Sequence, residues 1–397
     1  MKTKIFFCFL ILPVLVHAQS VHFENSLNEA FEKAVLENKP VFIEYYNSEC
    51  PVCKKLQPIF NDQKLGEFYN SHFVNYRLNT KDMKTEDSLF MASSKLKMPG
   101  YPYFLFFDAN KNFLHHSDTK PEVDYLIEIG EKALNPDERD ACLEKKYKNG
   151  DRSIKTLFAY SMLIQLYKND SLTTILADDL FKSFPKNELG SKKSYIITKN
   201  CVKSIDNGFF KYWIRNLDKL QESDYEKHKG DIKQRFADIV FNSIYSKERD
   251  NWSLEKIAEV KKDILITELS ANPGAYFWEQ ETKLLVEKKR YDDAFMIGRH
   301  MLDEEKTGIS ASVDIIHHFI DILTTTNELN TVKKWIDEIT SRTQNKSDEA
   351  DIMYLNALYY IKTNQTKLAR NTIDSALVFY KKNSIDTKLL TGLMNTK

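Results

Sequence analysis

Hydrophobic and polar positions follow two patterns along the chain, and the change falls near residue 135. Between residues 22 and 135, short apolar runs alternate with amphipathic stretches. Residues 27–38 carry apolar side chains at helical spacing, and residues 41–46 form a continuous β-favouring run, which predicts a helix and then a buried strand. Further strands are predicted at 72–78, 103–107 and 113–116, and further helices at 88–96 and 123–134. This alternation, closed by a hairpin, predicts an α/β sandwich over residues 22–135.

From about residue 150 to residue 397 the pattern is helical throughout. Apolar residues recur at helical spacing in segments of roughly 14 to 20 residues, an ordinary length for globular helices. Proline or glycine interrupts the segments at Pro185, Gly208, Pro273 and Gly308. Successive helices of this length with short breaks pack as antiparallel pairs. The pattern therefore predicts an all-α domain of solenoid type over residues 150–397.

Two stretches of the helical region resemble a tetratricopeptide repeat (TPR). Small and aromatic residues lie at the spacing of that repeat, which lets two helices cross closely. They are Ala357, Tyr360, Ala369, Ile373 and Ala376 in one stretch, and Trp278, Tyr291 and Ala294 in the other. The remaining helices depart from the consensus. We therefore predict a TPR-like helical-repeat domain, with an irregular helical bundle as the alternative.

Residues 1–18 have the pattern of a secretory signal peptide. Lys2 and Lys4 precede an apolar run at residues 5–16, and Ala18 follows as the small residue of a cleavage position. The run is too short to span a bilayer comfortably, and no second apolar stretch is long enough. We expect an exported protein, periplasmic or secreted, with no membrane span in the mature chain.

Charge and cysteine content narrow the function classes. Of 397 residues, 57 are Lys or Arg and 57 are Asp or Glu, so the chain is neutral. A neutral chain has no basic excess for nucleic acid or an anionic membrane, and we expect neither as a partner. Beyond the signal peptide there are four cysteines, Cys50, Cys53, Cys142 and Cys201, too few for a disulfide framework. An oxidising compartment nevertheless gives thiol–disulfide chemistry a role.

The segment EYYNSECPVCKKLQPIF, residues 44–60, places Cys50 and Cys53 at C-x-x-C spacing between a predicted strand and a predicted helix. Such a pair is half of a zinc site, a structural disulfide or a redox pair. A structural zinc site needs two further ligands, and Cys142 and Cys201 are isolated. The adjacent histidines of the pairs His115–His116 and His317–His318 point in different directions. We therefore expect no metal site.

The position of the pair favours redox chemistry. A cysteine at the start of a helix lies near unpaired backbone N–H groups, which stabilise a thiolate, and Lys54 adds positive potential. The second cysteine of such a motif is less exposed and resolves a mixed disulfide. Cys50 is therefore the expected nucleophile and Cys53 the expected resolving thiol. Their disulfide would be the redox group, and no organic cofactor is expected.

Residues 22–135 resemble the thioredoxin superfamily. The segment KPVFIEYYNSECPVCKKLQP, residues 39–58, has the family's strand, its C-x-x-C, the following Lys54 and the helix-kinking Pro58. The segment MPGYPYFLFF, residues 98–107, is similar to the family's second signature. The resemblance implies a cis peptide bond before Pro102, packed against the redox pair. It also implies a substrate contact at Tyr101.

The resemblance extends to a buried acid six residues before the first cysteine, where Glu44 stands, and to a basic partner on the next strand at Arg77. A buried carboxyl suits proton transfer from the resolving thiol because burial raises its pKa towards neutrality. The alternative is a strand residue whose carboxyl reaches solvent. The chain departs from the family pattern at Glu49, where tryptophan is usual. It departs again at Pro51 and Val52, which tune the pair and are candidate substrate contacts.

Three functions are compatible with these features. The first is an exported thiol–disulfide oxidoreductase acting on protein thiols and disulfides, with an unidentified redox partner and a helical domain that binds or positions a partner. The second is a protein-binding scaffold whose thioredoxin-like part is redox-quiescent. The third, ranked last, is a Cu(I) carrier with Cys50 and Cys53 as thiolate ligands and Met98 nearby. The reactivity of Cys50 separates the first from the second.

Overall fold

The computed structural model describes residues 20–220, 230–304 and 308–394, so the predicted signal peptide at 1–18 lies outside the described residues. The chain divides into two compact units, residues 1–232 and 233–397. The division falls inside the predicted helical region. The first helices after the sandwich therefore belong to the same unit as the sheet.

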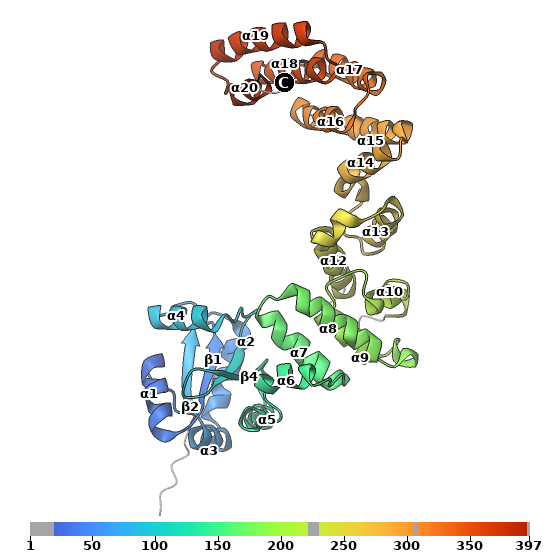
Figure 1. The fold of residues 1–397 in the computed structure, drawn as a ribbon. Coiled ribbons are helices and arrows are strands. Elements are labelled where there is room, and N and C mark those ends of the chain that lie inside the picture. The colour runs from blue at the N-terminus through green and yellow to red at the C-terminus, as the bar shows by residue number, and fades with distance from the viewer. Residues whose placement is uncertain (1–19, 221–229, 305–307, 395–397) are drawn as a thin grey trace, which may run out of the picture. The chain divides into compact units, whose positions relative to one another are not determined.

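Four strands form one mixed sheet in the first unit (Figure 1). They are β1 (Val41–Tyr46), β2 (Val74–Asn79), β3 (Tyr103–Phe107) and β4 (Phe113–Ser117), in the order β2-β1-β3-β4. β1 pairs parallel with β2 and antiparallel with β3, and β3 pairs antiparallel with β4. The central strands β1 and β3 are rich in β-branched or aromatic residues, which fit a pleated surface. Their order confirms the predicted sandwich with its terminal hairpin.

Helices cover both faces of this sheet. On one face lie α1 (Leu27–Glu37) and α4 (Thr85–Ser94), where the Phe90 ring packs on Phe31 and Phe107. On the other face lie α3 (Gln63–His72) and α5 (Val123–Leu134), and the Tyr69 ring of α3 packs on Phe42 of β1. The helix α3 was not predicted as a separate element.

Capping residues set the bounds of α1 and α3. The Ser26 hydroxyl accepts the Glu29 N–H at 3.2 Å, and the Asp62 carboxylate accepts the Leu65 N–H at 3.0 Å, so one orphan donor of each first turn is satisfied. Asn38 follows α1 with φ of 50°, a left-handed conformation that ends the helix.

The core that supports the site lies between the sheet and α3 and α5. It is largely aromatic, and its fully buried members include Phe42, Tyr69, Phe73, Phe104, Phe106, Leu126 and Ile129. Successive strand residues face opposite sides of a sheet, so Phe42 and Glu44 share a face of β1. That alternation brings the carboxyl of Glu44 into the core.

The remaining helices of the first unit form what we call the helical extension, residues 140–219. Its elements are η2 (Asp140–Cys142), α6 (Leu143–Lys148), α7 (Ile154–Leu166), α8 (Asp170–Ser183), η3 (Lys186–Glu188), α9 (Lys192–Cys201), α10 (Gly208–Ile214) and η4 (Leu217–Lys219), where η marks a 3-10 helix. The first of them, η2, packs against both β4 and α7. The extension thus begins on the edge strand of the sheet.

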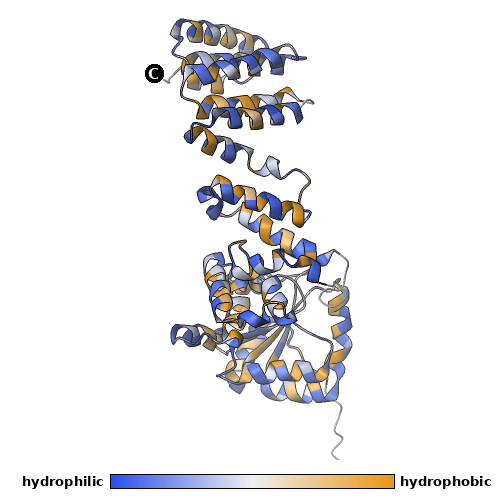
Figure 2. Cartoon of the chain, turned by 90° about the vertical axis from the view of Figure 1, so that its right-hand side faces the viewer, coloured by the Kyte–Doolittle hydropathy of each residue, from blue (hydrophilic) through white to orange (hydrophobic). Residues whose placement is uncertain are grey.

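The second unit is built from helices. They are α12 (Asp231–Ile244), η5 (Lys247–Asn251), α13 (Leu254–Ile266), η6 (Pro273–Tyr276), α14 (Trp278–Glu287), α15 (Tyr291–Glu304), α16 (Ile309–Ile322), α17 (Thr326–Thr340), α18 (Lys346–Lys362), α19 (Thr366–Lys382) and α20 (Lys388–Leu393). The α-helices among them carry hydrophobic beside hydrophilic residues (Figure 2). Helices adjacent in sequence pack together, as in the pairs α14–α15 and α18–α19.

Small residues named for the repeat spacing are buried on helices that pack in pairs. Ala357 on α18, Ala376 on α19 and Ala294 on α15 are fully buried, and α18 packs against α19. Small residues at such positions let helix backbones approach closely. The all-α region after the sandwich is confirmed. Its assignment to the TPR class stays a prediction.

Candidate redox site

Cys50 and Cys53 lie where β1 gives way to a helix, as the sequence predicts. β1 ends at Tyr46, and after a short loop Cys50 is the N-cap of α2 (Pro51–Leu56). Cys50 is partly exposed, whereas Cys53 is 1% exposed, and both are free thiols. α2 passes into the 3-10 helix η1 (Gln57–Asn61), which contains Pro58, so the helix changes type at the predicted kink.

The surroundings of Cys50 favour its thiolate. Partial burial raises the pKa of the Cys50 thiol, but hydrogen bonds from the Cys53 backbone N–H, the Cys53 thiol and the Val52 backbone N–H lower it, and so does the charge of Lys54. The net effect is a pKa below the ordinary cysteine value. First-turn N–H groups and a following lysine were the features expected to activate Cys50.

The opposite holds for Cys53. Burial raises the pKa of its thiol to about 11, opposed by the backbone N–H of Asn47 and assisted by Cys50 and by the charge of Glu44. Cys53 therefore stays protonated while Cys50 ionises. The two thiols of one motif are separated in acidity, the arrangement expected of a nucleophile and a resolving thiol.

Glu44 is completely buried and pairs with Arg77. The two residues are directly opposite in the parallel β1–β2 register, and Arg77 Nε donates to Glu44 Oε2 at 2.6 Å. Glu44 Oε1 has no hydrogen-bond partner. Burial raises the pKa of Glu44 to about 7, although the charge and hydrogen bond of Arg77 oppose the shift. Glu44 does not reach solvent, so the alternative of an exposed strand carboxyl is wrong.

Aromatic rings hold the guanidinium of Arg77. It lies 4.6 Å from the ring centroid of Tyr46, 5.1 Å from that of Phe23 and 5.7 Å from that of Phe60. Cation–π contacts of this kind fix a planar guanidinium and shield it from water. Arg77 is thus a fixed partner for Glu44, and its aromatic contacts were not predicted.

The Tyr101–Pro102 peptide bond is cis, as predicted. Tyr45 of β1 is opposite Tyr103 of β3 in an antiparallel register, so the end of β1 and the start of β3 share one edge of the sheet. The loop to Cys50 leaves from that edge and Pro102 enters there. Tyr101 is 45% exposed, Pro51 is exposed and Val52 is 55% exposed, so the predicted substrate contacts are accessible.

Two contacts of the site were missed by the sequence reasoning. Glu49, where the family pattern has tryptophan, forms an ion pair with Lys81 in the loop after β2. The Asn47 backbone N–H bonds to Cys53, and its side chain donates to Thr80 Oγ1 at 3.2 Å. Both contacts join loops that follow paired strands. A signal for them was the parallel pairing of β1 and β2, which brings those loops to one edge.

A scan of protein-family models matches residues 27–116 to the thioredoxin-like domain family. These residues form a thioredoxin-like domain. It is similar to the structure of a DsbH oxidoreductase, with 22% identity and a TM-score of 0.28 over 32% of this chain and 92% of that one. It is also similar to a proposed disulphide-isomerase from Bacteroides thetaiotaomicron, with 22% identity and a TM-score of 0.26 over 30% and 97%. No curated protein matches. At these TM-scores, the assignment rests on the family model and the fold described above.

The histidine pair of the thioredoxin-like domain is engaged by the helical extension. The Nδ1 atoms of His115 and His116 lie 2.9 and 2.6 Å from one oxygen of Asp140, and all three side chains are largely buried. Burial alone would raise the pKa of Asp140, but its hydrogen bonds and charge interactions with His115 and His116 hold that pKa well below the usual value. The sequence predicts that these adjacent histidines point in different directions, but both rings reach the same carboxylate. Across the described residues, no three His, Cys, Asp or Glu side chains are grouped to hold a metal ion.

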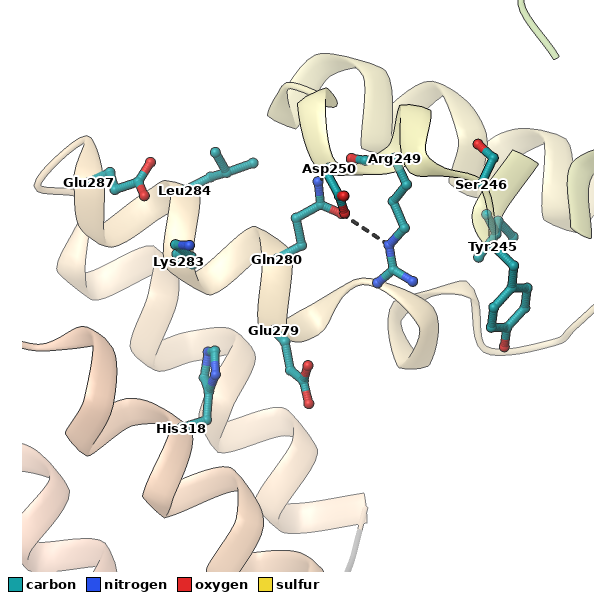
Figure 3. Close-up of a pocket in the computed structure, with 11 residues that line it drawn as sticks. Tyr245, Ser246, Arg249, Asp250, Glu279, Gln280, Lys283, Leu284, Glu287 and His318 are labelled. Atoms are coloured by element: carbon teal, nitrogen blue, oxygen red, sulfur yellow. Dashed lines mark hydrogen bonds between the residues drawn. The ribbon is translucent and has the colours of Figure 1, made fainter. Parts of the chain in front are cut away.

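Outside the thioredoxin-like domain, the second unit has an open groove of about 690 Å³. It lies between η5 and α14, beside the end of α12, with His318 of α16 on its wall (Figure 3). Arg249 Nε donates to Gln280 Oε1 at 3.1 Å across it, and Glu279 and Lys283 add opposite charges to its lining. None of the described helices is long and apolar enough to cross a bilayer.

Proposed function

We propose that this protein is an exported thiol–disulfide oxidoreductase of thioredoxin type that acts on protein thiols and disulfides. The observation that carries the proposal is the asymmetry of the two thiols: Cys50 is accessible with a lowered pKa, and Cys53 is buried with a raised one. A structural disulfide needs no such difference. Catalytic exchange does, because one thiol must attack while the other waits.

In the reducing direction the Cys50 thiolate attacks one sulfur of a substrate disulfide. The S–S bond of the substrate breaks, its leaving thiolate takes a proton from solvent, and a mixed disulfide links Cys50 to the substrate. Pro51 and Val52 follow Cys50 directly in the chain, Tyr101 precedes the cis-proline, and all three present accessible surface to the substrate. Pro102 and its flanking backbone, at the same sheet edge, hold the substrate chain extended.

The second step needs a proton acceptor for Cys53, whose pKa of about 11 keeps it neutral. Glu44 is suited to this task because its pKa of about 7 lies near the working pH and its Oε1 is unpartnered. Cys53 passes its proton to Glu44, directly or through a water molecule, and attacks the Cys50 sulfur. The substrate sulfur leaves as a thiolate and takes a proton from solvent or from Glu44, the enzyme becomes a disulfide, and two electrons have moved to the substrate. A small thiol or an unidentified redox partner restores the dithiol.

The proposal is tested by reaction of the reduced full chain with a peptide disulfide, followed by separation of the products by mass. Oxidation of each Cys50–Cys53 pair is expected to yield two peptide thiols, one from each sulfur of the peptide disulfide. The Cys50→Ser variant is the matched control because it keeps Cys53 and the fold. A wild-type protein that reacts no faster than this variant would overturn the proposal.

The groove of the second unit favours a second candidate, the partner-binding scaffold. Its open shape and its lining of both charge signs suit a polar protein segment. In that case the thioredoxin-like domain would be structural, and Cys50 would not react in the test above. The Cu(I) carrier stays the third alternative, because the two thiols alone supply its proposed ligands.

A further inference from the structure

The helical extension touches the segment that carries the cis-proline. The last four C=O groups of a helix have no partner within it. Leu166 is the last residue of α7, and its carbonyl oxygen accepts the backbone N–H of Lys97 at 2.6 Å. Leu166 is buried, whereas the Lys97 side chain is exposed. The residue that caps α7 thus lies five positions before Pro102, in the loop that leads to it.

The extension also acts at the other end of that segment. Asp140, in η2, accepts the backbone N–H of His116 at 2.7 Å and its ring Nδ1–H at 2.6 Å. The His116 ring stacks on Tyr103, with ring centroids 6.3 Å apart and planes inclined by 10°. Tyr103 follows Pro102 directly. Residues of the extension therefore hold the backbone before the cis-proline and the side chain after it.

We propose that the helical extension positions residues 97–103 for substrate binding, with Leu166 and Asp140 as positioning residues. The inference rests on the proposed function, because it concerns the surface that receives the substrate next to Cys50. An extended substrate needs the Tyr101–Pro102 backbone in one conformation. Fixing both ends of this segment in advance removes ordering that the substrate would otherwise have to impose. Chemistry at the Cys50 sulfur does not need the clamp.

The hydrogen bond from the Lys97 N–H to the Leu166 carbonyl can be tested with two variants of Lys97 that both lack its side-chain charge. Lys97→Pro lacks the N–H donor, and its matched control Lys97→Ala keeps it. The reduced full chain is mixed with an extended peptide disulfide or with a small aromatic disulfide, and second-order rate constants are measured. We expect Lys97→Pro to react about fivefold more slowly with the peptide than Lys97→Ala, the effect of one net hydrogen bond of about 1 kcal/mol. Both should react equally with the small disulfide.

The second anchor gives an independent variant if Lys97→Pro does not fold. Asp140→Ala removes the acceptor for His116, and Glu144→Ala removes an exposed acid of α6 that pairs with Lys148. Asp140→Ala should slow the peptide reaction by severalfold and leave the small-disulfide reaction unchanged. Glu144→Ala should change neither rate. A merely structural role for Asp140 would lower both rates together.

The outcomes separate this inference from the proposed function. If the wild-type protein reacts with neither disulfide, the oxidoreductase proposal fails, and the positioning role fails with it. If the wild-type protein reacts with both while Lys97→Pro and Asp140→Ala match their controls on the peptide, the positioning role alone is overturned. Equal losses on both disulfides overturn it as well, because the extension would then support the Cys50 chemistry rather than the substrate surface.

Discussion

Burial separates the roles of two chemically identical residues in the C-x-x-C pair. Cys50 stands at the exposed start of α2, and Cys53 lies one turn later against the core. We expect Cys53→Ser to accumulate a mixed disulfide between Cys50 and a peptide disulfide, because nothing then resolves it. Cys50→Ser should accumulate none. Non-reducing electrophoresis after acid quenching measures the trapped species, and trapping through Cys53 instead would reverse the assignment.

The proton acceptor can be tested at the same scale. Glu44→Gln keeps the shape of the side chain but cannot take the proton of Cys53. We expect resolution of the mixed disulfide to slow by about a hundredfold at pH 7, a common effect for loss of general base catalysis. In the wild-type protein this step should fall as the pH drops below about 7, because Glu44 becomes protonated. Rapid-quench measurements from pH 5 to pH 9 would show no such inflection in the variant, and an unchanged profile would remove Glu44 from the mechanism.

The raised pKa of Glu44 also predicts how the free energy of unfolding changes with pH. Its pKa is about 7 in the folded protein against 4.5 for the ordinary side chain, so the folded state binds more protons between these values. The free energy of unfolding should therefore fall as the pH rises through this window. Relative to Glu44→Gln, we expect the wild-type protein to lose about 3 kcal/mol between pH 4 and pH 8. Urea unfolding of both proteins across that range measures the difference, and parallel curves would contradict it.

Single elements were predictable where local sequence decides them. The strands at 41–46 and 103–107 and the helix at 123–134 have the predicted bounds, because an apolar run or a helical stripe is bounded by turn residues. α3 was missed because we expected the helix of the C-x-x-C segment to be kinked at Pro58, and did not expect a second helix to begin at Gln63 with Asp62 as its N-cap. Burial of Glu44 and its pairing with Arg77 were implied by the resemblance to the thioredoxin superfamily. The Lys81, Asp140 and Leu166 contacts were not, because they join segments whose proximity depends on tertiary packing.

Close helix packing in the second unit depends on a glycine. A Cβ added at Gly298 of α15 would lie 2.5 Å from the Phe319 ring and 2.9 Å from the Trp335 ring. Both rings belong to the buried cluster of this unit, so they cannot move freely. We expect Gly298→Ala to destabilise the second unit by about 1–3 kcal/mol, as overpacking does. Thermal unfolding followed by circular dichroism measures this.

A second helical glycine provides the control for the Gly298 substitution. Gly392 lies in α20, and a Cβ there meets no atom within 4 Å. Gly392→Ala should therefore change stability by less than about 1 kcal/mol, in the stabilising direction, because alanine favours helix. If both substitutions acted alike, helix propensity rather than packing against Phe319 would explain the Gly298 effect.

At the scale of the whole molecule, the sheet and the helical extension share one unit, and the remaining helices form another. The sequence predicts that the first domain ends near residue 135, where the period of the hydrophobic pattern changes. Tertiary contacts, not the hydrophobic period, decide which segments form one compact unit. Here η2 packs on β4, and the last residue of α7 accepts a hydrogen bond from the loop before Pro102. A change of secondary-structure class along the chain therefore does not by itself mark the end of a folding unit.

Whether the molecule oxidises or reduces its partners depends on the reduction potential of the Cys50–Cys53 pair in the intact chain. The lowered pKa of Cys50 stabilises the dithiol form as its thiolate and so favours an oxidant, whereas the raised pKa of Cys53 opposes this. We expect a reversible two-electron transition when the full chain is equilibrated against glutathione and its free thiols are counted by alkylation and mass. Cys50→Ser should abolish the transition. Cys142→Ser, on η2 and outside the pair, should leave it in place. Thiols that never pair, or a disulfide that glutathione cannot open, would leave the thioredoxin-like domain a structural module and favour the scaffold.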